Sequence, residues 1–198
     1  MKRFLLFFVF LLSAGLYSLT VTGQVQKDSL NDVITYLTGS AEDINVVGSG
    51  GLFLVGGSTD VDVAFKWFLS RASGGDVVVL RARGGAGYNE YMFNLCPINS
   101  VETIIIDSRE KSAMPYVTNK IRNAEALFIS GGDQYNYVKN WKDTPVEDAI
   151  NYLINQKKAV VGGTSAGLAI LGEAYYSAAS GTSLTAVDGL ADPYGPNV

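Results

Sequence analysis

Short apolar runs alternate with helix-like segments from residue 52 to residue 162. Each run is followed by glycine or polar residues, and continuous apolar runs of this length are typical of strands buried on both faces. The segments between them show apolar residues at helical spacing or a proline in the first turn. The predicted strands are residues 52–55, 77–80, 101–106, 126–130 and 159–162, and the predicted helices are residues 61–69, 115–123 and 145–158.

Helix boundaries can also be predicted from single residues. Asp60 or Thr59 is the expected N-cap of the helix over residues 61–69. The segment 145–158 begins with proline and acids and ends with lysines, which suits the helix macrodipole. The mixed segment before residue 52 contains a stretch, residues 28–37, that we expect to form a short helix.

Strands that alternate with helices predict an α/β fold with a parallel sheet and helices on each face, a three-layer sandwich. Ligands in such folds bind beyond the carboxyl ends of the strands. We therefore expect several polar side chains, far apart in the chain, to gather along one rim. These are Arg81, Arg83, Arg109, Asp133, Gln134 and Ser165.

The first 23 residues have the order of a secretory signal peptide. Lys2 and Arg3 precede an apolar stretch, and small residues precede Gln24. A membrane anchor is the alternative, but the unbroken apolar run is shorter than the ~20 residues of a spanning helix. We expect a secreted protein in which residues 24–51 lead into one domain, residues 52–198.

Charge and cysteine content exclude other classes. The formal net charge is −4, and removal of residues 1–23 would make it −6. A mildly acidic chain without a basic cluster is a poor candidate for binding nucleic acid. Cys96 is the single cysteine, so no disulfide forms within the chain.

Residues 163–167 fit the pattern G-x-S-x-G between a predicted strand and a predicted helix. In hydrolases this pattern places a nucleophilic serine, here Ser165, on a sharp turn that needs small neighbours such as Gly163 and Gly167. The amide of Ala166, at the start of the helix, is placed to donate to an oxyanion. An ordinary glycine-rich turn is the alternative interpretation.

A second glycine-rich segment follows the strand over residues 126–130. Gly131 and Gly132 allow the backbone to approach a ligand closely, and their amides are candidates to complete an oxyanion hole. The alternative is a tight turn in which Asp133 caps a helix that begins near Gln134, and both interpretations can hold together. The glycine patterns of phosphate and dinucleotide loops are absent from the sequence.

The sequence contains no histidine to act as the base for Ser165. Lys157 and Lys158 precede the last predicted strand, at the end of that strand opposite the serine. Glu173 lies about 12 Å along the following helix and off the face of the serine. The position of Asp188 is not predicted. Among these groups, none is a convincing base.

Four stretches resemble a known family: "LFLVGGS", "ALFISGGDQYNYVKNW", "DTPVEDAINYL" and "AVVGGTSAGLAILGEAYYS" are similar to segments of the cyanophycinase and dipeptidase E family of serine peptidases. The resemblance implies a flavodoxin-like fold related to class I glutamine amidotransferase domains. It also implies cleavage next to aspartyl residues, in small peptides or in an Asp–Arg polymer, without metal or other cofactor.

By this resemblance Ser165 matches the nucleophile, the amides of Gly132 and Ala166 match the oxyanion hole, and Gln134 matches a glutamine that lines the site. The family histidine lies in an Asp-x-His segment beyond the serine helix, which residues up to Val198 do not include. We therefore expect that the C-terminal part of the domain is missing and that the 198-residue piece is inactive. A non-catalytic binding protein with a retained pocket is one alternative; a lipase-like hydrolase is another.

The substrate side of the predicted site depends on arginine. A guanidinium pairs with a carboxylate through two hydrogen bonds, and the alternative is a solvated loop charge. We expect Arg81 and Arg83 to point to opposite faces and favour Arg83, with Tyr88 and Asn89 further along the pocket wall and Asp133 nearby. The expected partner is a small acidic peptide or an Asp-containing polymer. We do not expect the protein to bind nucleic acid or, after cleavage of the signal peptide, a membrane. A homodimer is possible from the sequence.

Overall fold

The computed structural model describes residues 24–28, 33–179, 181 and 185–195. The predicted signal peptide lies outside the described residues. Within them, no helix has the length and hydropathy to cross a membrane.

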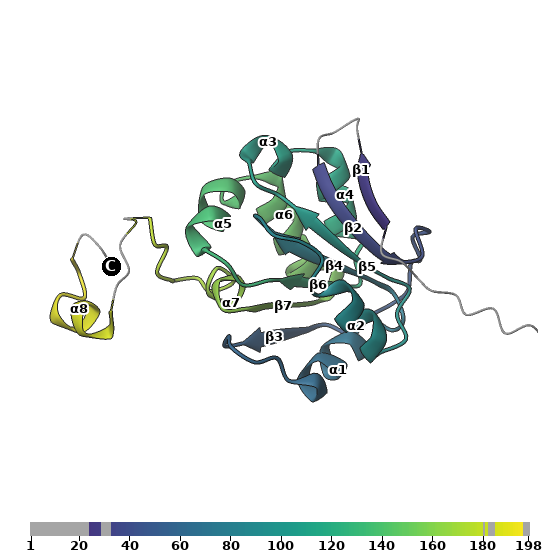
Figure 1. The fold of residues 1–198 in the computed structure, drawn as a ribbon, viewed down its shortest axis with the longest axis horizontal. Coiled ribbons are helices and arrows are strands. Elements are labelled where there is room, and N and C mark those ends of the chain that lie inside the picture. The colour runs from purple at the N-terminus through teal and green to yellow at the C-terminus, as the bar shows by residue number, and fades with distance from the viewer. Residues whose placement is uncertain (1–23, 29–32, 180, 182–184, 196–198) are drawn as a thin grey trace, which may run out of the picture.

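One sheet runs through the middle of the molecule, in the strand order β1-β2-β5-β4-β6-β7-β3 (Figure 1). The neighbouring strands from β5 to β3 in this order are parallel, and β1 and β2 are antiparallel to their neighbours. The strands are β1 Gln24–Asp28, β2 Val33–Gly39, β3 Gly51–Val55, β4 Asp76–Arg81, β5 Ser100–Ile105, β6 Ala126–Ile129 and β7 Val160–Thr164.

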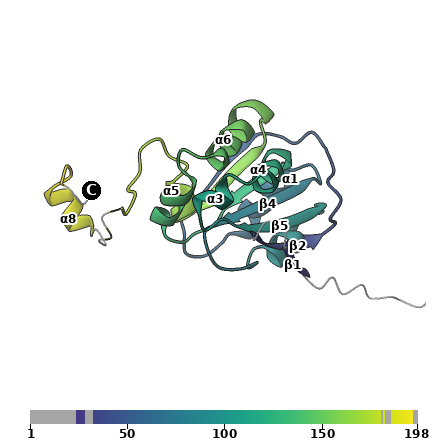
Figure 2. The ribbon, with the colours of Figure 1, turned by 90° about the horizontal axis from the view of Figure 1, so that it is seen from above.

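Helices cover both faces of the sheet and make it the middle of three layers (Figures 1 and 2). On one face an aromatic cluster that includes Phe53, Phe65 and Phe128 joins β3 and β6 to α1, and α2 packs beside it. On the other face Ile121, Trp141 and Ala149 are among the buried residues that join the sheet to α4, α5 and α6. The helices are α1 Asp62–Ser70, α2 Asn89–Leu95, α3 Arg109–Ser112, α4 Pro115–Asn123, α5 Gln134–Trp141, α6 Pro145–Tyr152, α7 Ala166–Ala169 and α8 Ala186–Ala191, with a π-helical turn η1 at Leu153–Lys157.

The predicted fold class is confirmed, as an α/β three-layer sandwich with a mainly parallel sheet. Each of the five predicted strands is present as β3, β4, β5, β6 or β7. The helix predicted over residues 28–37 is wrong, because residues 33–39 form strand β2. Val33, Ile34 and Thr35 are β-branched, and Val33 and Thr35 are buried at every second position, which favours a strand.

Two helix boundaries differ from the predicted ones. The N-cap of α1 is Val61, without a side-chain cap, whereas the carboxylate of Asp60 accepts a 3.5 Å hydrogen bond from the Tyr88 hydroxyl. The helix predicted over residues 145–158 widens after Tyr152 into η1 and ends at Lys158, whose φ is +59°.

Candidate active site

Ser165 occupies a strained turn between β7 and α7. Its backbone has φ 51° and ψ −120°, outside the conformations that residues with a Cβ atom usually adopt. The Ser165 amide donates a 3.1 Å hydrogen bond to the carbonyl oxygen of Val55, and its carbonyl oxygen accepts a 2.9 Å bond from the Ala169 amide. The side chain is exposed. Strain of this kind persists where surrounding structure enforces it, and it is frequent at catalytic residues.

The glycines on each side of Ser165 permit this turn. A Cβ atom on Gly163 would lie 2.5 Å from the carbonyl oxygen of Gly167. A Cβ atom on Gly167 would lie 2.7 Å from the carbonyl carbon of Ile129 and 2.7 Å from the carbonyl oxygen of Ser130. Because these neighbours are backbone atoms that cannot move aside, the steric requirement predicted for Gly163 and Gly167 is confirmed.

Two further glycines lie against the serine side chain. A Cβ atom on Gly57 would be 3.3 Å from Cβ of Ser165 and 3.7 Å from its Oγ. A Cβ atom on Gly131 would be 3.4 Å from Cβ of Ser165. The space around Ser165 is therefore bordered by segments that follow β3 and β6, with β7 supplying the serine itself.

Tyr137 holds the Gly131–Gly132 segment in place. Its buried hydroxyl lies 2.8 Å from the carbonyl oxygen of Ser130 and 3.0 Å from that of Gly131, and donates to them. Burial raises the pKa of this hydroxyl, so it remains a donor. Sequence reasoning missed Tyr137, although its place three residues after Gln134 on α5 turns it back toward the strand end.

Asp133 is the N-cap of α5, as the capping interpretation predicted. Its Oδ1 accepts a 2.9 Å hydrogen bond from the amide of Tyr135, and its Oδ2 accepts a 3.4 Å bond from the Asn136 side chain. The side-chain amide of Gln134 donates to the carbonyl oxygen of Tyr176 at 3.3 Å. Gln134 thus joins the start of α5 to the segment after α7.

A cavity of about 320 Å³ lies beside the Gly131–Gly132 segment. Residues 81–84 line one side, and residues 131–133 with Asn136 and Tyr137 line the other. Ser165 does not line the cavity. Gly131 does line it, and Gly131 also lies against the Ser165 side chain. The cavity therefore adjoins the serine turn on the side of β6.

Arg81 and Arg83 both line this cavity, so the expectation that they point to opposite faces is wrong. Residues two positions apart on a strand lie on the same face, so strand alternation itself places Arg81 and Arg83 together. One Nη of Arg81 donates to the carbonyl oxygen of Gly85 at 2.9 Å, and its buried Nε has no partner. Among the described residues, no carboxylate forms an ion pair with either arginine.

Two other residues that the sequence placed at the site, Asn89 and Arg109, form hydrogen bonds within the fold instead. Asn89 is 1% exposed, donates to the carbonyl oxygens of Tyr36 and Val101 at 2.8 and 3.0 Å, and accepts from Thr103 at 2.6 Å. Since both polar atoms of its side chain are used in the interior, the substrate contact predicted for Asn89 is wrong. Arg109 also belongs to the framework, because it donates to three carbonyl oxygens at the end of α5.

Tyr88 is half-buried beside the aromatic cluster and does not line the 320 Å³ cavity. Its ring lies 4.9 Å from that of Phe128 and 5.9 Å from that of Phe65. Burial and the nearby Asp60 carboxylate raise the pKa of Tyr88 to about 12. The hydroxyl therefore stays neutral at physiological pH, as a donor to Asp60.

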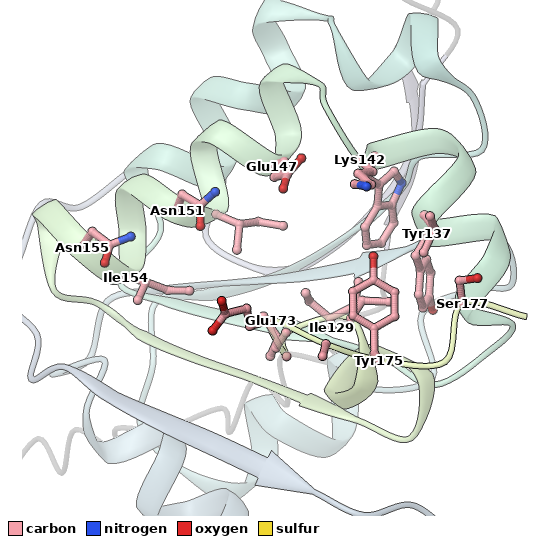
Figure 3. A pocket seen from close by; sticks show the side chains of 17 residues that line it. Ile129, Tyr137, Lys142, Glu147, Asn151, Ile154, Asn155, Glu173, Tyr175 and Ser177 are labelled. Atoms are coloured by element: carbon pink, nitrogen blue, oxygen red, sulfur yellow. The ribbon is translucent and has the colours of Figure 1, made fainter. Parts of the chain in front are cut away.

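A larger hollow of about 1040 Å³ lies between α5, α6, η1 and residues 170–177 (Figure 3). Ile129 and Ile154 are part of its apolar lining, whereas Glu147 and Glu173 contribute carboxylates. Neither Ser165 nor the two arginines line it. Although this hollow is larger than the 320 Å³ cavity, its lining therefore gives no reason to connect it with the chemistry of the serine turn.

The described residues offer no base beside Ser165. Lys157 donates to Glu125 at 3.0 Å and to the carbonyl oxygens of Asn123 and Ala124, at the opposite end of the sheet. Asp188 forms a capping box with Thr185 in α8, and these hydrogen bonds lower its pKa. Within the described ranges, no group of three histidine, cysteine or acidic side chains is arranged to hold a metal ion.

A sequence profile of peptidase family S51 matches residues 93–190, a range that contains both glycine-rich segments. Two curated relatives are cyanophycinases, one of Synechococcus elongatus and one of Thermosynechococcus vestitus. Each is 28% identical over 76 residues, which is 38% of this chain and 24% of the relative. Residues 93–190 of the chain match peptidase family S51, and the predicted resemblance is confirmed.

The matched relatives extend well beyond this chain, which spans about a quarter of their length. Two solved structures are also similar. One is a peptidase from an acI-B1 actinobacterium, with a TM-score of 0.49 and 18% identity over 63% of this chain and 57% of that chain. The other is a protein assigned to peptidase E from Listeria monocytogenes EGD-e, with a TM-score of 0.46 and 21% identity over 62% of this chain and 61% of that chain.

Proposed function

We propose that the protein is a serine-type peptidase in which Ser165 is the nucleophile. The observation that carries this proposal is the strained backbone of an exposed serine, enclosed by glycines from three strand ends. The amides of Gly132 and Ala166 are the proposed oxyanion donors. Ala166 is at the first turn of α7, where free amides and the helix dipole favour an anion.

The proposed substrates are small acidic peptides or an Asp-containing polymer, cleaved next to aspartyl residues as in the cyanophycinases that the chain resembles. Arg83 and Arg81 are the proposed carboxylate ligands. Both line the cavity beside the serine turn, and neither has a carboxylate partner among the described residues. Arg81 is partly buried, and an unpaired guanidinium that is partly withdrawn from water is stabilised when an anion binds to it. Arg83 is exposed and contributes a positive charge that attracts an anion to the cavity.

The 198 residues contain no histidine, so we propose that the chain by itself has little peptidase activity. Without a general base, the hydroxyl of Ser165 stays protonated, and positioned proton transfer typically contributes ~10²–10⁴-fold to the rate. The test is hydrolysis of β-aspartyl and aspartyl-arginine peptides by the protein and by Ser165→Ala. Fast turnover that Ser165→Ala abolishes would show that a base exists within these residues.

The missing imidazole also favours a second candidate, a binding protein that has kept the pocket without catalysis. Free imidazole distinguishes the two. For a peptidase, added imidazole raises peptide hydrolysis in the protein and not in Ser165→Ala, because it accepts the serine proton. For a binding protein, aspartyl peptides bind, but imidazole produces no hydrolysis that depends on Ser165.

We also propose that the protein is exported. The basis is the order of Lys2, Arg3, the apolar stretch and the small residues before Gln24. N-terminal sequencing of the protein recovered outside the cytoplasm should begin at Gln24. Retention of residues 1–23 on a protein that stays in the cell would contradict the proposal.

A further inference from the structure

Arg81 carries a buried polar atom that the fold leaves without a partner. Its Nη1 donates to the carbonyl oxygen of Gly85 at 2.9 Å, but its Nε is buried and has no hydrogen-bond partner within the described structure. Removing a charged N–H group from water without a new acceptor lowers stability. The atoms that enclose Nε belong to the described residues themselves, so its burial does not arise from an exposed edge of the sheet.

The loop that follows β4 covers the guanidinium of Arg81. A Cβ atom on Gly84 would lie 3.1 Å from Cζ, 3.1 Å from Nη2 and 3.2 Å from Nε of Arg81. The φ of Gly84 is +109°, which residues with a side chain rarely adopt, so this contact requires glycine. Nε and Nη2 together can bind both oxygens of one carboxylate, and Gly84 lies against both of these nitrogens.

This loop is short and lies between fixed ends. Strand β4 ends at Arg81, and Asn89 is buried with three hydrogen bonds to β2 and β5. Three of the four residues 84–87 are glycine. In the described part of the chain, two hydrogen bonds hold them: Arg81 to Gly85, and the Asn89 amide to the carbonyl oxygen of Ala86 at 2.9 Å. A glycine segment with few contacts between rigid ends can change its conformation at small cost.

We propose that residues 84–87 form a lid that a carboxylate displaces through Arg81. Arg81 and Gly84 both line the 320 Å³ cavity. A carboxylate in this cavity pairs with Nη2 and Nε of Arg81 when Gly84 moves away from the guanidinium. Binding gives Nε the acceptor that it lacks, and this gain favours the displaced loop. The inference rests on the proposed function for its ligand, an acidic substrate, and adds the movement of the lid.

The lid can be followed by NMR spectroscopy through one resonance. Arg83–Gly84 is the only Arg–Gly pair in the sequence, so isotope labels in the arginine carbonyl carbon and the glycine nitrogen select the amide signal of Gly84. Succinate, a dicarboxylate, should shift this signal. It should also move the Nε–H signal of Arg81 downfield, because that group gains an acceptor. Succinamide, the uncharged analogue of succinate, should shift neither signal.

Variants separate the hold of Arg81 on the lid from ligand binding. Arg81→Ala removes the bond to Gly85, so without succinate its Gly84 signal should already be displaced in the direction that succinate causes in the unmodified protein. Its affinity for succinate should decrease at least tenfold. Arg81→Lys keeps the charge without the paired nitrogens, so bound succinate should shift Gly84 much less. Arg122→Ala, at an exposed arginine that stacks on Tyr152, is the control and should respond like the unmodified protein.

The outcomes distinguish this inference from the proposed function, since no readout requires catalysis by Ser165. Succinate binding that leaves the Gly84 signal in place overturns the lid and leaves the arginine ligands of the proposed function intact. Absence of succinate binding overturns both. A Gly84 signal that is the same in Arg81→Ala and in the unmodified protein also overturns the lid, because the loop would then not depend on Arg81.

Discussion

The amide of Ser165 donates a 3.1 Å hydrogen bond to the carbonyl oxygen of Val55. This bond joins the candidate nucleophile to strand β3, and Gly57, two positions after the end of β3, lies against the serine side chain. The strained backbone of Ser165 is thus held in place by contacts with a strand that lies more than 100 positions earlier in the sequence. Its geometry depends on close packing of β3, β6 and β7 at their carboxyl ends.

Substitution of Gly167 should destabilise the fold. In Gly167→Ala, the new Cβ atom meets backbone atoms of Ile129 and Ser130 that cannot move aside. We expect a loss of about 3 kcal/mol in the free energy of unfolding, or a decrease in Tm on the order of 6–12 °C. Gly56→Ala is the matched control, because a Cβ atom there meets nothing within 4 Å. Equal Tm values for the two variants would contradict the packing argument.

Tyr137 should affect the reactivity of Ser165 as a positioning residue. Tyr137→Phe removes the donor to the carbonyl oxygens of Ser130 and Gly131 and should cost about 1–3 kcal/mol of stability. The Gly132 amide then loses its fixed place, and acylation of Ser165 by an aspartyl p-nitrophenyl ester should slow at least tenfold below the unfolding temperature. Tyr135→Phe, on the exposed side of α5, should acylate at the original rate. A slower rate in both variants would point to general loosening of α5.

Arg83 and Arg81 should determine selectivity for substrate charge. Arg83→Ala should slow acylation by an aspartyl ester roughly ten- to a hundredfold, as expected for loss of a charge-assisted hydrogen bond of ~1.5–3 kcal/mol. It should leave acylation by the matched asparaginyl ester nearly unchanged. Arg81→Ala should act in the same direction, whereas Arg109→Ala should lower stability without altering selectivity. Equal losses with both esters would assign the arginines to folding.

Tyr88 should contribute to stability against alkali. Its pKa in the folded protein is about 12, above the ordinary value of 10, because of burial and the Asp60 carboxylate. The folded state therefore holds the proton more tightly, and the contribution is complete below pH 10 and decreases as the pH rises from 10 to 12. Melting curves should show a shallower decrease of Tm over this range for Tyr88→Phe than for the unmodified protein. Tyr194→Phe, at a 97% exposed tyrosine, should behave like the unmodified protein.

The parts of the structure that depend on local pattern could be predicted from the sequence. Continuous apolar runs identified the five parallel strands, and G-x-S-x-G indicated the crowded turn whose steric reason Gly163 and Gly167 confirm. Long-range contacts could not be predicted. Asn89 resembles a loop residue in the sequence, but three partners on β2 and β5 bury it. Arg81 and Arg83 line one cavity, as alternation requires of residues two positions apart on a strand, so their assignment to opposite faces misapplied the rule.

The central claim, that Ser165 is the nucleophile, is tested most directly by trapping an acyl group on it. With an aspartyl p-nitrophenyl ester, Oγ of Ser165 forms the new acyl bond, p-nitrophenolate leaves and the serine proton passes to solvent. Because p-nitrophenolate is a good leaving group, this reaction needs little help from a base. Intact mass and peptide mapping should find one acyl group, on Ser165, that persists because hydrolysis of the acyl-enzyme also lacks a base. The adduct should disappear in Ser165→Ala and remain in Ser73→Ala, another exposed serine with positive φ. An adduct on other residues, or an equal adduct in Ser165→Ala, would contradict the account.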